Sequence, residues 1–102
     1  MTTLEKAVSV IVDAIHPRKV ILFGSQARGD ASAQSDYDFL VITSQETGLR
    51  ALAQNAYRGM RHIGAPVDLV MINEKHLAQV KDNPFMIYRF ACMEGKTVYE
   101  QS

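Results

Sequence analysis

Hydrophobic residues in the first part of the chain recur at helical spacing. Residues Thr2–Ile15 are therefore predicted to form an amphipathic helix, whose apolar positions fall three or four apart: Leu4, Ala7, Val8, Ile11, Val12 and Ile15. Thr2 and Glu5 have the spacing of a capping box. His16-Pro17 is predicted to end the helix, because the residue before a proline avoids the helical conformation.

Short apolar runs farther along have the length and β-branched content of strands. They are Val20–Phe23, the segment from Asp36 to about Thr43, Val67–Ile72 and a last short strand, Lys96–Glu100. In the second of these, Tyr37 and Phe39 alternate with two aspartates and are predicted to point into the core.

Three further helices are predicted between these strands. They are Gln45–Ile63, Glu74–Lys81 with Asn73 as its N-cap, and Pro84–Glu94, which begins after Asn83 and ends at Gly95. On Gln45–Ile63 the apolar residues form one stripe. Arg50, Arg58 and Arg61 lie off that stripe and are interpreted as a solvated face, although one or two of them reaching a triphosphate or a partner is the alternative.

This order of elements predicts one domain over residues 1–102, of class α/β (α+β), with a small mixed β-sheet and helices packed against it. The first two strands are joined only by a turn and a polar loop, Asp30–Gln34. That connection is short for a parallel crossover, so these strands are expected to be antiparallel.

The predicted helix Pro84–Glu94 is apolar most of the way round. Such a helix has to be buried on all sides, and a domain of this size has few places for it. We therefore weigh core packing against an interface that forms a homo- or hetero-oligomer. Cys92, on this helix, is expected to be a buried small hydrophobe.

Composition narrows the classes of function. Eleven basic and eleven acidic residues give a formal net charge of zero, which argues against nucleic acid as a partner. A single cysteine excludes an intramolecular disulfide and fits a cytoplasmic location. No apolar run is long enough to span a membrane and no signal-peptide pattern is seen, so no membrane association is expected.

Candidate chemistry is concentrated in residues 21–41. Gly24 follows the first strand directly and allows a sharp bend and the close approach of a ligand. Ser25 stands where a short helix would begin, so that amide N–H groups and a hydroxyl would face an anionic phosphate. Gly29 is predicted to end this helix.

Asp36 and Asp38 lie two residues apart in a predicted strand. Their side chains would point to one face about 7 Å apart along the chain, where they repel each other unless a cation is present. Mg²⁺ suits such hard oxygen ligands and takes its remaining ligands from substrate phosphates. The alternative is a β-hairpin with two solvated aspartates.

The pattern of Gly24-Ser25, ten residues and Asp36-x-Asp38 resembles the signature of the DNA polymerase β-like nucleotidyltransferase superfamily. The fuller string GSQARGDASAQSDYDFLV is similar to its minimal nucleotidyltransferase (MNT) branch, whose members include MntA-type antitoxins. The match is tight over Phe23–Val41 and looser, but in the right order, over nearly the whole chain. The resemblance implies a polymerase β palm-like core.

The resemblance also implies roles for these residues. Asp36, Asp38 and a third carboxylate on a neighbouring strand would hold two Mg²⁺ ions, and Asp68 in Val67–Ile72 is the residue placed for the third. Gly24 and Ser25 would bind the phosphates of ATP. Arg28 would either touch phosphate or only brace the loop.

Short members of this family act beside a helical HEPN partner, so the resemblance implies an antitoxin that transfers AMP from ATP to a tyrosine of a HEPN-type toxin. Two alternatives remain open: a non-catalytic binding module that neutralises a partner by contact, and a nucleotidyltransferase acting on a small molecule or an RNA end. The sequence does not decide the acceptor, the nucleotide preference or the oligomeric state.

Overall fold

The computed structural model describes residues 1–29 and 36–101, so the predicted loop Asp30–Gln34 lies outside the described residues. Its elements follow in the order α1 (Thr3–Ile15), β1 (Lys19–Phe23), α2 (Ser25–Arg28), β2 (Tyr37–Thr43), α3 (Leu49–Gly59), β3 (Val67–Asn73), α4 (Glu74–Val80), α5 (Ile87–Glu94) and β4 (Lys96–Glu100).

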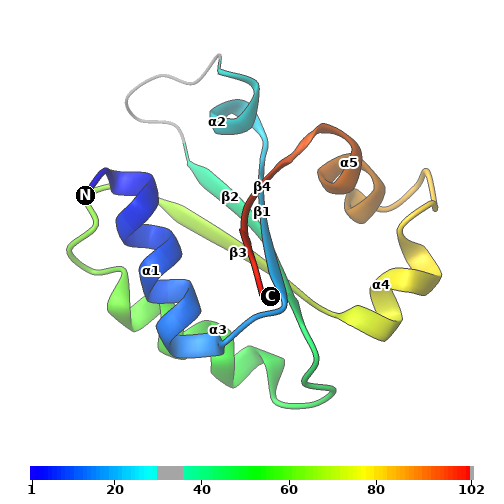
Figure 1. Ribbon diagram of the computed structural model, residues 1–102, viewed down its shortest axis with the longest axis horizontal. Helices are drawn as coiled ribbons and strands as arrows, with labels where there is room; N and C mark the ends of the chain where they lie inside the picture. The colour runs from blue at the N-terminus through cyan, green and yellow to red at the C-terminus, as the bar shows by residue number, and fades with distance from the viewer. Residues whose placement is uncertain (30–35, 102) are drawn as a thin grey trace.

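The four strands form one mixed sheet in the order β3-β2-β1-β4. β1 pairs antiparallel with β2 and with β4, whereas β2 and β3 run parallel. The predicted antiparallel pairing of the first two strands and the predicted fold class are therefore confirmed. α1 and α3 lie on one side of the sheet and α4 and α5 on the other (Figure 1).

Alternation along the strands divides the core in two. The odd-numbered β2 residues Phe39 and Val41 pack with α1 and α3 in one cluster, while Leu40 and Ile42 pack toward α4 and α5 in the other. Tyr37 joins the first cluster, as predicted. Because side chains alternate along a strand, Asp38 shares its face with Leu40 and Ile42.

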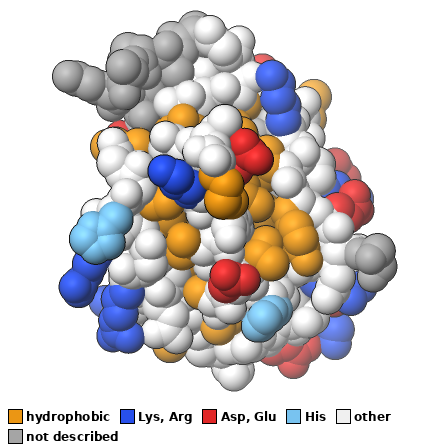
Figure 2. Space-filling view, turned by 60° about the vertical axis from the view of Figure 1, so that its left-hand side comes forward, with side chains coloured by type: hydrophobic (Ala, Val, Ile, Leu, Met, Phe, Trp, Pro, Cys, Tyr) orange, Lys and Arg blue, Asp and Glu red, His pale blue; other side chains and the backbone are white. Residues whose placement is uncertain are grey.

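The amphipathic α1 begins with the predicted capping box, in which the Thr2 hydroxyl accepts a hydrogen bond from the Glu5 amide. The side of α1 that carries Leu4 and Val8 is not fully covered by the sheet. A hollow of about 410 Å³ lies there, between these residues and Val98 of β4. Figure 2 views the molecule from this side and shows hydrophobic side chains exposed among charged ones.

Two helices were predicted with the wrong bounds. α3 begins at Leu49 instead of Gln45, because Gly48 adopts a left-handed conformation (φ 71°) just before it, and it ends at Gly59. α5 begins at Ile87 instead of Pro84, because the Asn83 side chain accepts a hydrogen bond from the Phe85 amide and holds this segment in a turn.

Of the two alternatives weighed for the last helix, core packing within this chain does not hold for α5, and the interface alternative stays a prediction. Only Ala91 is fully buried, and Phe85 and Met93 keep 94% and 69% of their surface exposed. Cys92 is exposed as well, not buried. Among the described residues, no helix has the length and apolar content needed to cross a membrane.

The turn from α5 into β4 depends on the absence of a side chain at Gly95. A Cβ atom there would overlap the Ile21 side chain and the Ala91 carbonyl oxygen, and it would lie 2.9 Å from the Leu22 carbonyl oxygen. We expect Gly95→Ala to lower the free energy of unfolding by about 2 kcal/mol in urea titration, since overpacking of this kind costs ~1–3 kcal/mol.

Gly64→Ala is the matched control. Gly64 has a φ of +86° and no atom within 4 Å of the added Cβ, so only backbone strain of about 1 kcal/mol is expected. Equal losses in the two variants would contradict the packing argument for Gly95.

Candidate functional site

The chain bends at Gly24, between β1 and α2. Gly24 has φ 76° and ψ −159°, a conformation that disfavours any other residue. Its carbonyl oxygen accepts hydrogen bonds from the Ala27 and Arg28 amides, both at 3.1 Å. α2 then ends at Gly29 in the left-handed conformation. The predicted bend and short helix are confirmed.

Asp38 lies directly against this bend. In the antiparallel ladder Phe23 of β1 is opposite Asp38 of β2, and a Cβ atom on Gly24 would overlap the Asp38 carboxylate. Glycine is thus required at position 24 for two reasons, its positive φ and the space that the carboxylate occupies.

Asp68 is the register partner of Asp38 in the parallel β2–β3 ladder. Residues opposite each other in a ladder project to the same face, so both carboxylates lie on the α4/α5 side of the sheet. Asp36 precedes β2 and is exposed. The fold therefore brings Asp68, distant in sequence, beside the Asp36-x-Asp38 pair.

Among the three aspartates, Asp38 is the one whose negative charge is clearly destabilised by its surroundings. Its partial burial raises the pKa of the Asp38 carboxyl above the ordinary value of 3.8, and the negative charges of Asp68 and Asp36 raise it further. The carboxylates therefore disfavour one another's ionisation in the protein alone, which is the situation that a bound cation relieves.

The residues fit a cation that brings part of its own coordination shell. Within the described part of the chain, no three His, Cys, Asp or Glu side chains are placed to hold a metal ion by themselves. Mg²⁺ normally uses one or two carboxylates and completes its shell with water and phosphate oxygens. Clustered aspartates beside the Gly24 bend match that requirement.

The remaining predicted residues lie on the same bend. Ser25 is half-buried at the start of α2, and Arg28 is exposed at its end. One contact was not predicted from the sequence: the Tyr57 hydroxyl of α3 accepts a hydrogen bond of 2.8 Å from the Leu69 amide, next to Asp68. No sequence pattern distinguishes Tyr57 from other exposed helical residues.

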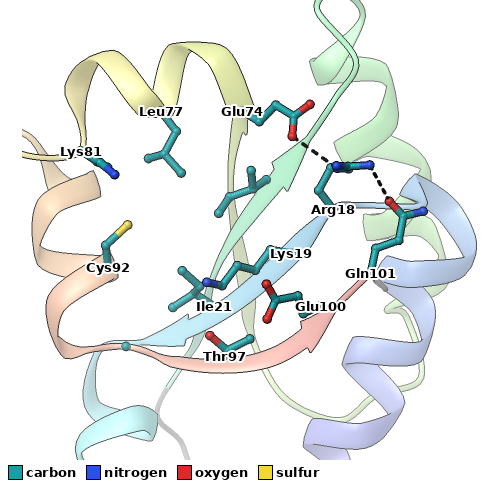
Figure 3. Close-up of a pocket in the computed structure, with 12 residues that line it drawn as sticks. Arg18, Lys19, Ile21, Glu74, Leu77, Lys81, Cys92, Thr97, Glu100 and Gln101 are labelled. Carbon is teal, nitrogen blue, oxygen red and sulfur yellow. Dashed lines mark hydrogen bonds and ion pairs between the residues drawn. The ribbon is translucent and has the colours of Figure 1, made fainter.

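A second hollow, of about 480 Å³, lies between α4, α5, β1 and β4 (Figure 3). Arg18 contacts Glu74 at 3.3 Å and Gln101 at 3.2 Å along its rim. Arg18 and Lys19 stand at the start of β1, whereas Asp38 is opposite its end. None of the predicted site residues lines this hollow, so it is distinct from the aspartate site.

Comparison with known proteins agrees with this geometry. The model of the nucleotidyltransferase domain family matches residues 2–91, so the chain belongs to that family. Protein adenylyltransferase MntA from Aphanizomenon flos-aquae is 29% identical over 86 residues, which cover 82% of this chain. The chain spans only 57% of the length of that relative.

Two crystal structures share the fold. One is a protein assigned as a nucleotidyltransferase from Sulfolobus solfataricus, with a TM-score of 0.63 and 20% identity over 97% of this chain and 78% of that one. The other is a chain of a toxin–antitoxin complex with AMP-PNP, with a TM-score of 0.65 and 22% identity over 96% of this chain and 73% of that one.

The raised pKa of Asp38 predicts a pH-dependent penalty on stability. Below about pH 3.8 this carboxyl is protonated in both the folded and the unfolded protein, and the penalty is absent. It grows as the pH rises through the higher pKa of the folded state. We therefore expect Asp38→Asn to raise the melting temperature of the metal-free protein at pH 7, with the gain vanishing in acid.

Asp82→Asn, which changes an exposed turn residue, is the control and should leave the melting temperature nearly unchanged. Added Mg²⁺ should stabilise the wild type more than Asp38→Asn. A lower melting temperature for Asp38→Asn at pH 7 would count against a carboxylate cluster under mutual repulsion.

Proposed function

We propose that this chain is a Mg²⁺-dependent nucleotidyltransferase that moves AMP from ATP to a hydroxyl group. The observation that carries this proposal is the in-register pair of Asp38 and Asp68, of which Asp38 lies against the Gly24 bend. Membership of the nucleotidyltransferase domain family supports the reaction class.

The residues divide into two groups. Gly24 and Ser25 bind the β- and γ-phosphates, because the bare backbone of Gly24 allows their close approach. Arg28 ends α2 on the same bend and is assigned to the phosphate side. Asp36, Asp38 and Asp68 would hold two Mg²⁺ ions together with phosphate oxygens, and the bound metal would neutralise phosphate charge and lower the pKa of the attacking hydroxyl.

The reaction is an in-line displacement at the α-phosphorus. The acceptor oxygen forms a bond to that phosphorus, the bond to the β-phosphate oxygen breaks, and pyrophosphate leaves. We assign Asp68, which lies on the edge strand β3, to the acceptor side, where it takes the hydroxyl proton. Positioning and charge neutralisation account for most of the rate enhancement in this scheme.

We further propose that the acceptor is a tyrosine of a HEPN-type helical toxin, for which this chain is the antitoxin. Two likenesses support this: the similarity to Protein adenylyltransferase MntA, and the shared fold with a chain of a toxin–antitoxin complex. Because the chain spans 57% of the MntA relative, the acceptor has to be established by experiment.

The surface of α5 supports a protein partner. Five large hydrophobic side chains are exposed within nine residues, and together they form what we call the α5 surface: Phe85, Met86, Ile87, Phe90 and Met93. α5 packs through Ala91 on Ile21 and Phe23, and Phe23 lies opposite Asp38. A toxin bound to the α5 surface would therefore lie close to the aspartates.

The deciding experiment mixes the protein with ATP, Mg²⁺ and a HEPN-type helical toxin from the same organism. We expect the partner to gain the mass of one adenylyl group on a tyrosine in intact and peptide mass spectra. The gain should be lost with EDTA and with the Asp36→Asn/Asp38→Asn double variant. An unmodified partner with the wild-type protein would contradict the proposal.

The α5 surface also favours a second candidate, a module that neutralises its partner by contact alone. The Asp36→Asn/Asp38→Asn variant separates the two functions, since a contact antitoxin would still protect cells from the toxin. Loss of protection in this variant, with partner binding retained, favours the enzyme.

We expect Phe85→Asp/Met93→Asp to weaken partner binding at least about tenfold in calorimetry, because buried aromatic anchors dominate interface energies. Both positions are largely exposed, so the melting temperature should not change. Gln79→Asp on the exposed face of α4 adds a charge elsewhere and is the control. Unchanged affinity in the double variant would remove the α5 surface from the interface.

A further inference from the structure

Basic and acidic residues are unevenly distributed in this neutral protein. From Thr47 to Val67 the chain contains three arginines and one histidine but no aspartate or glutamate. Arg58, Arg61 and His62 are exposed at the end of α3 and in the turn that follows. We call these three residues the basic flank.

The basic flank is tied to the strand that carries Asp68. Tyr57, next to Arg58, holds the Leu69 amide at 2.8 Å, and the Pro66 carbonyl oxygen accepts a hydrogen bond of 3.0 Å from the Tyr37 amide. Figure 1 shows α3 and its turn leading into the start of β3. The flank thus stands at the end of the sheet where the aspartates lie.

No acidic side chain among the described residues forms an ion pair with the two arginines of the flank. In the described part of the chain, Arg58 bonds only the neutral Asn55 side chain, at 3.0 Å, and Arg61 has no ion pair. Cationic groups at a rim of this kind act mainly by steering and selecting partners of opposite charge.

The basic flank and the proposed triphosphate site lie on opposite faces of the sheet. α3 packs on the sheet face formed by Phe39 and Val41, whereas Asp38 and Asp68 project from the opposite face. β3 is the edge strand between the two sides. A ligand that contacts the flank can reach the aspartates by crossing the β3 edge, on the side assigned to the acceptor.

We propose that the basic flank binds an acidic stretch of polypeptide that adjoins the acceptor hydroxyl and guides it across the β3 edge to Asp68. This inference rests on the proposed function, because that function places the acceptor beside Asp68. A polypeptide fits better than RNA, since this protein has a net charge of zero and lacks the basic excess that is typical of proteins binding a nucleic-acid backbone.

The test uses three fluorescein-labelled probes of equal length: a peptide with one tyrosine between glutamates, the same peptide with lysines instead, and a single-stranded RNA. Binding to the full chain is measured by anisotropy at low salt without ATP. The proteins are the wild type, Arg58→Glu/Arg61→Glu, and Arg50→Glu. Arg50 lies about 12 Å away at the other end of α3 and provides the matched control.

We expect the wild type to prefer the glutamate peptide over the lysine peptide. Arg58→Glu/Arg61→Glu should bind the glutamate peptide about tenfold more weakly, since two attractive contacts become repulsive. Arg50→Glu should bind it like the wild type. Moderate salt should reduce the difference. Equal affinity for the lysine peptide, tighter binding of RNA, or an equal loss in Arg50→Glu would overturn the inference.

Adding ATP and Mg²⁺ to the same mixtures separates the two proposals. Glutamate-peptide binding that follows the expected pattern without AMP transfer supports the basic flank and counts against the proposed function. AMP transfer at equal KM to both peptides, unchanged in Arg58→Glu/Arg61→Glu, supports the proposed function and overturns the inference.

Discussion

The site depends on one constraint, the close packing of the Asp38 carboxylate against the backbone of Gly24. Gly24 leaves room for the Asp38 carboxylate, and the β1–β2 register brings the two together. The β2–β3 register then places Asp68 beside Asp38. Since a shift of one residue in either ladder would turn an aspartate to the other face, the site exists only in this register.

The apolar clusters maintain that register. Phe39 and Val41 are anchored among α1 and α3, and Leu40 and Ile42 are anchored beneath α4 and α5. A slip of β2 would have to invert both sets at once, which buried side chains oppose strongly. The stability of this sheet therefore maintains the geometry of the aspartates, although mutual repulsion of the carboxylates works against it.

The two faces of the sheet carry surfaces of different chemistry, one apolar and one basic. α5 exposes large apolar side chains on the same side of the sheet as Asp38, whereas the basic flank follows α3 on the other side. In the proposed function, these two surfaces would contact a macromolecular acceptor from opposite sides of the sheet.

Local patterns in the sequence determined much of this protein. The Gly24 bend, the caps at Thr2 and Asn73, the strands and the pairing direction of β1 and β2 all follow from neighbouring residues, because turns, caps and alternation are short-range effects. The resemblance carried by Gly24-Ser25 and Asp36-x-Asp38 indicated the family, which the family match over residues 2–91 confirms.

Only the tertiary structure decided how distant segments meet. The direct pairing of Asp68 with Asp38 depends on strand register, and the Tyr57–Leu69 hydrogen bond depends on how α3 packs. The exposure of Phe85 and Cys92 could not be inferred either. An apolar helix looks the same in sequence whether its outer face is covered or open, since burial is set by which elements pack against it.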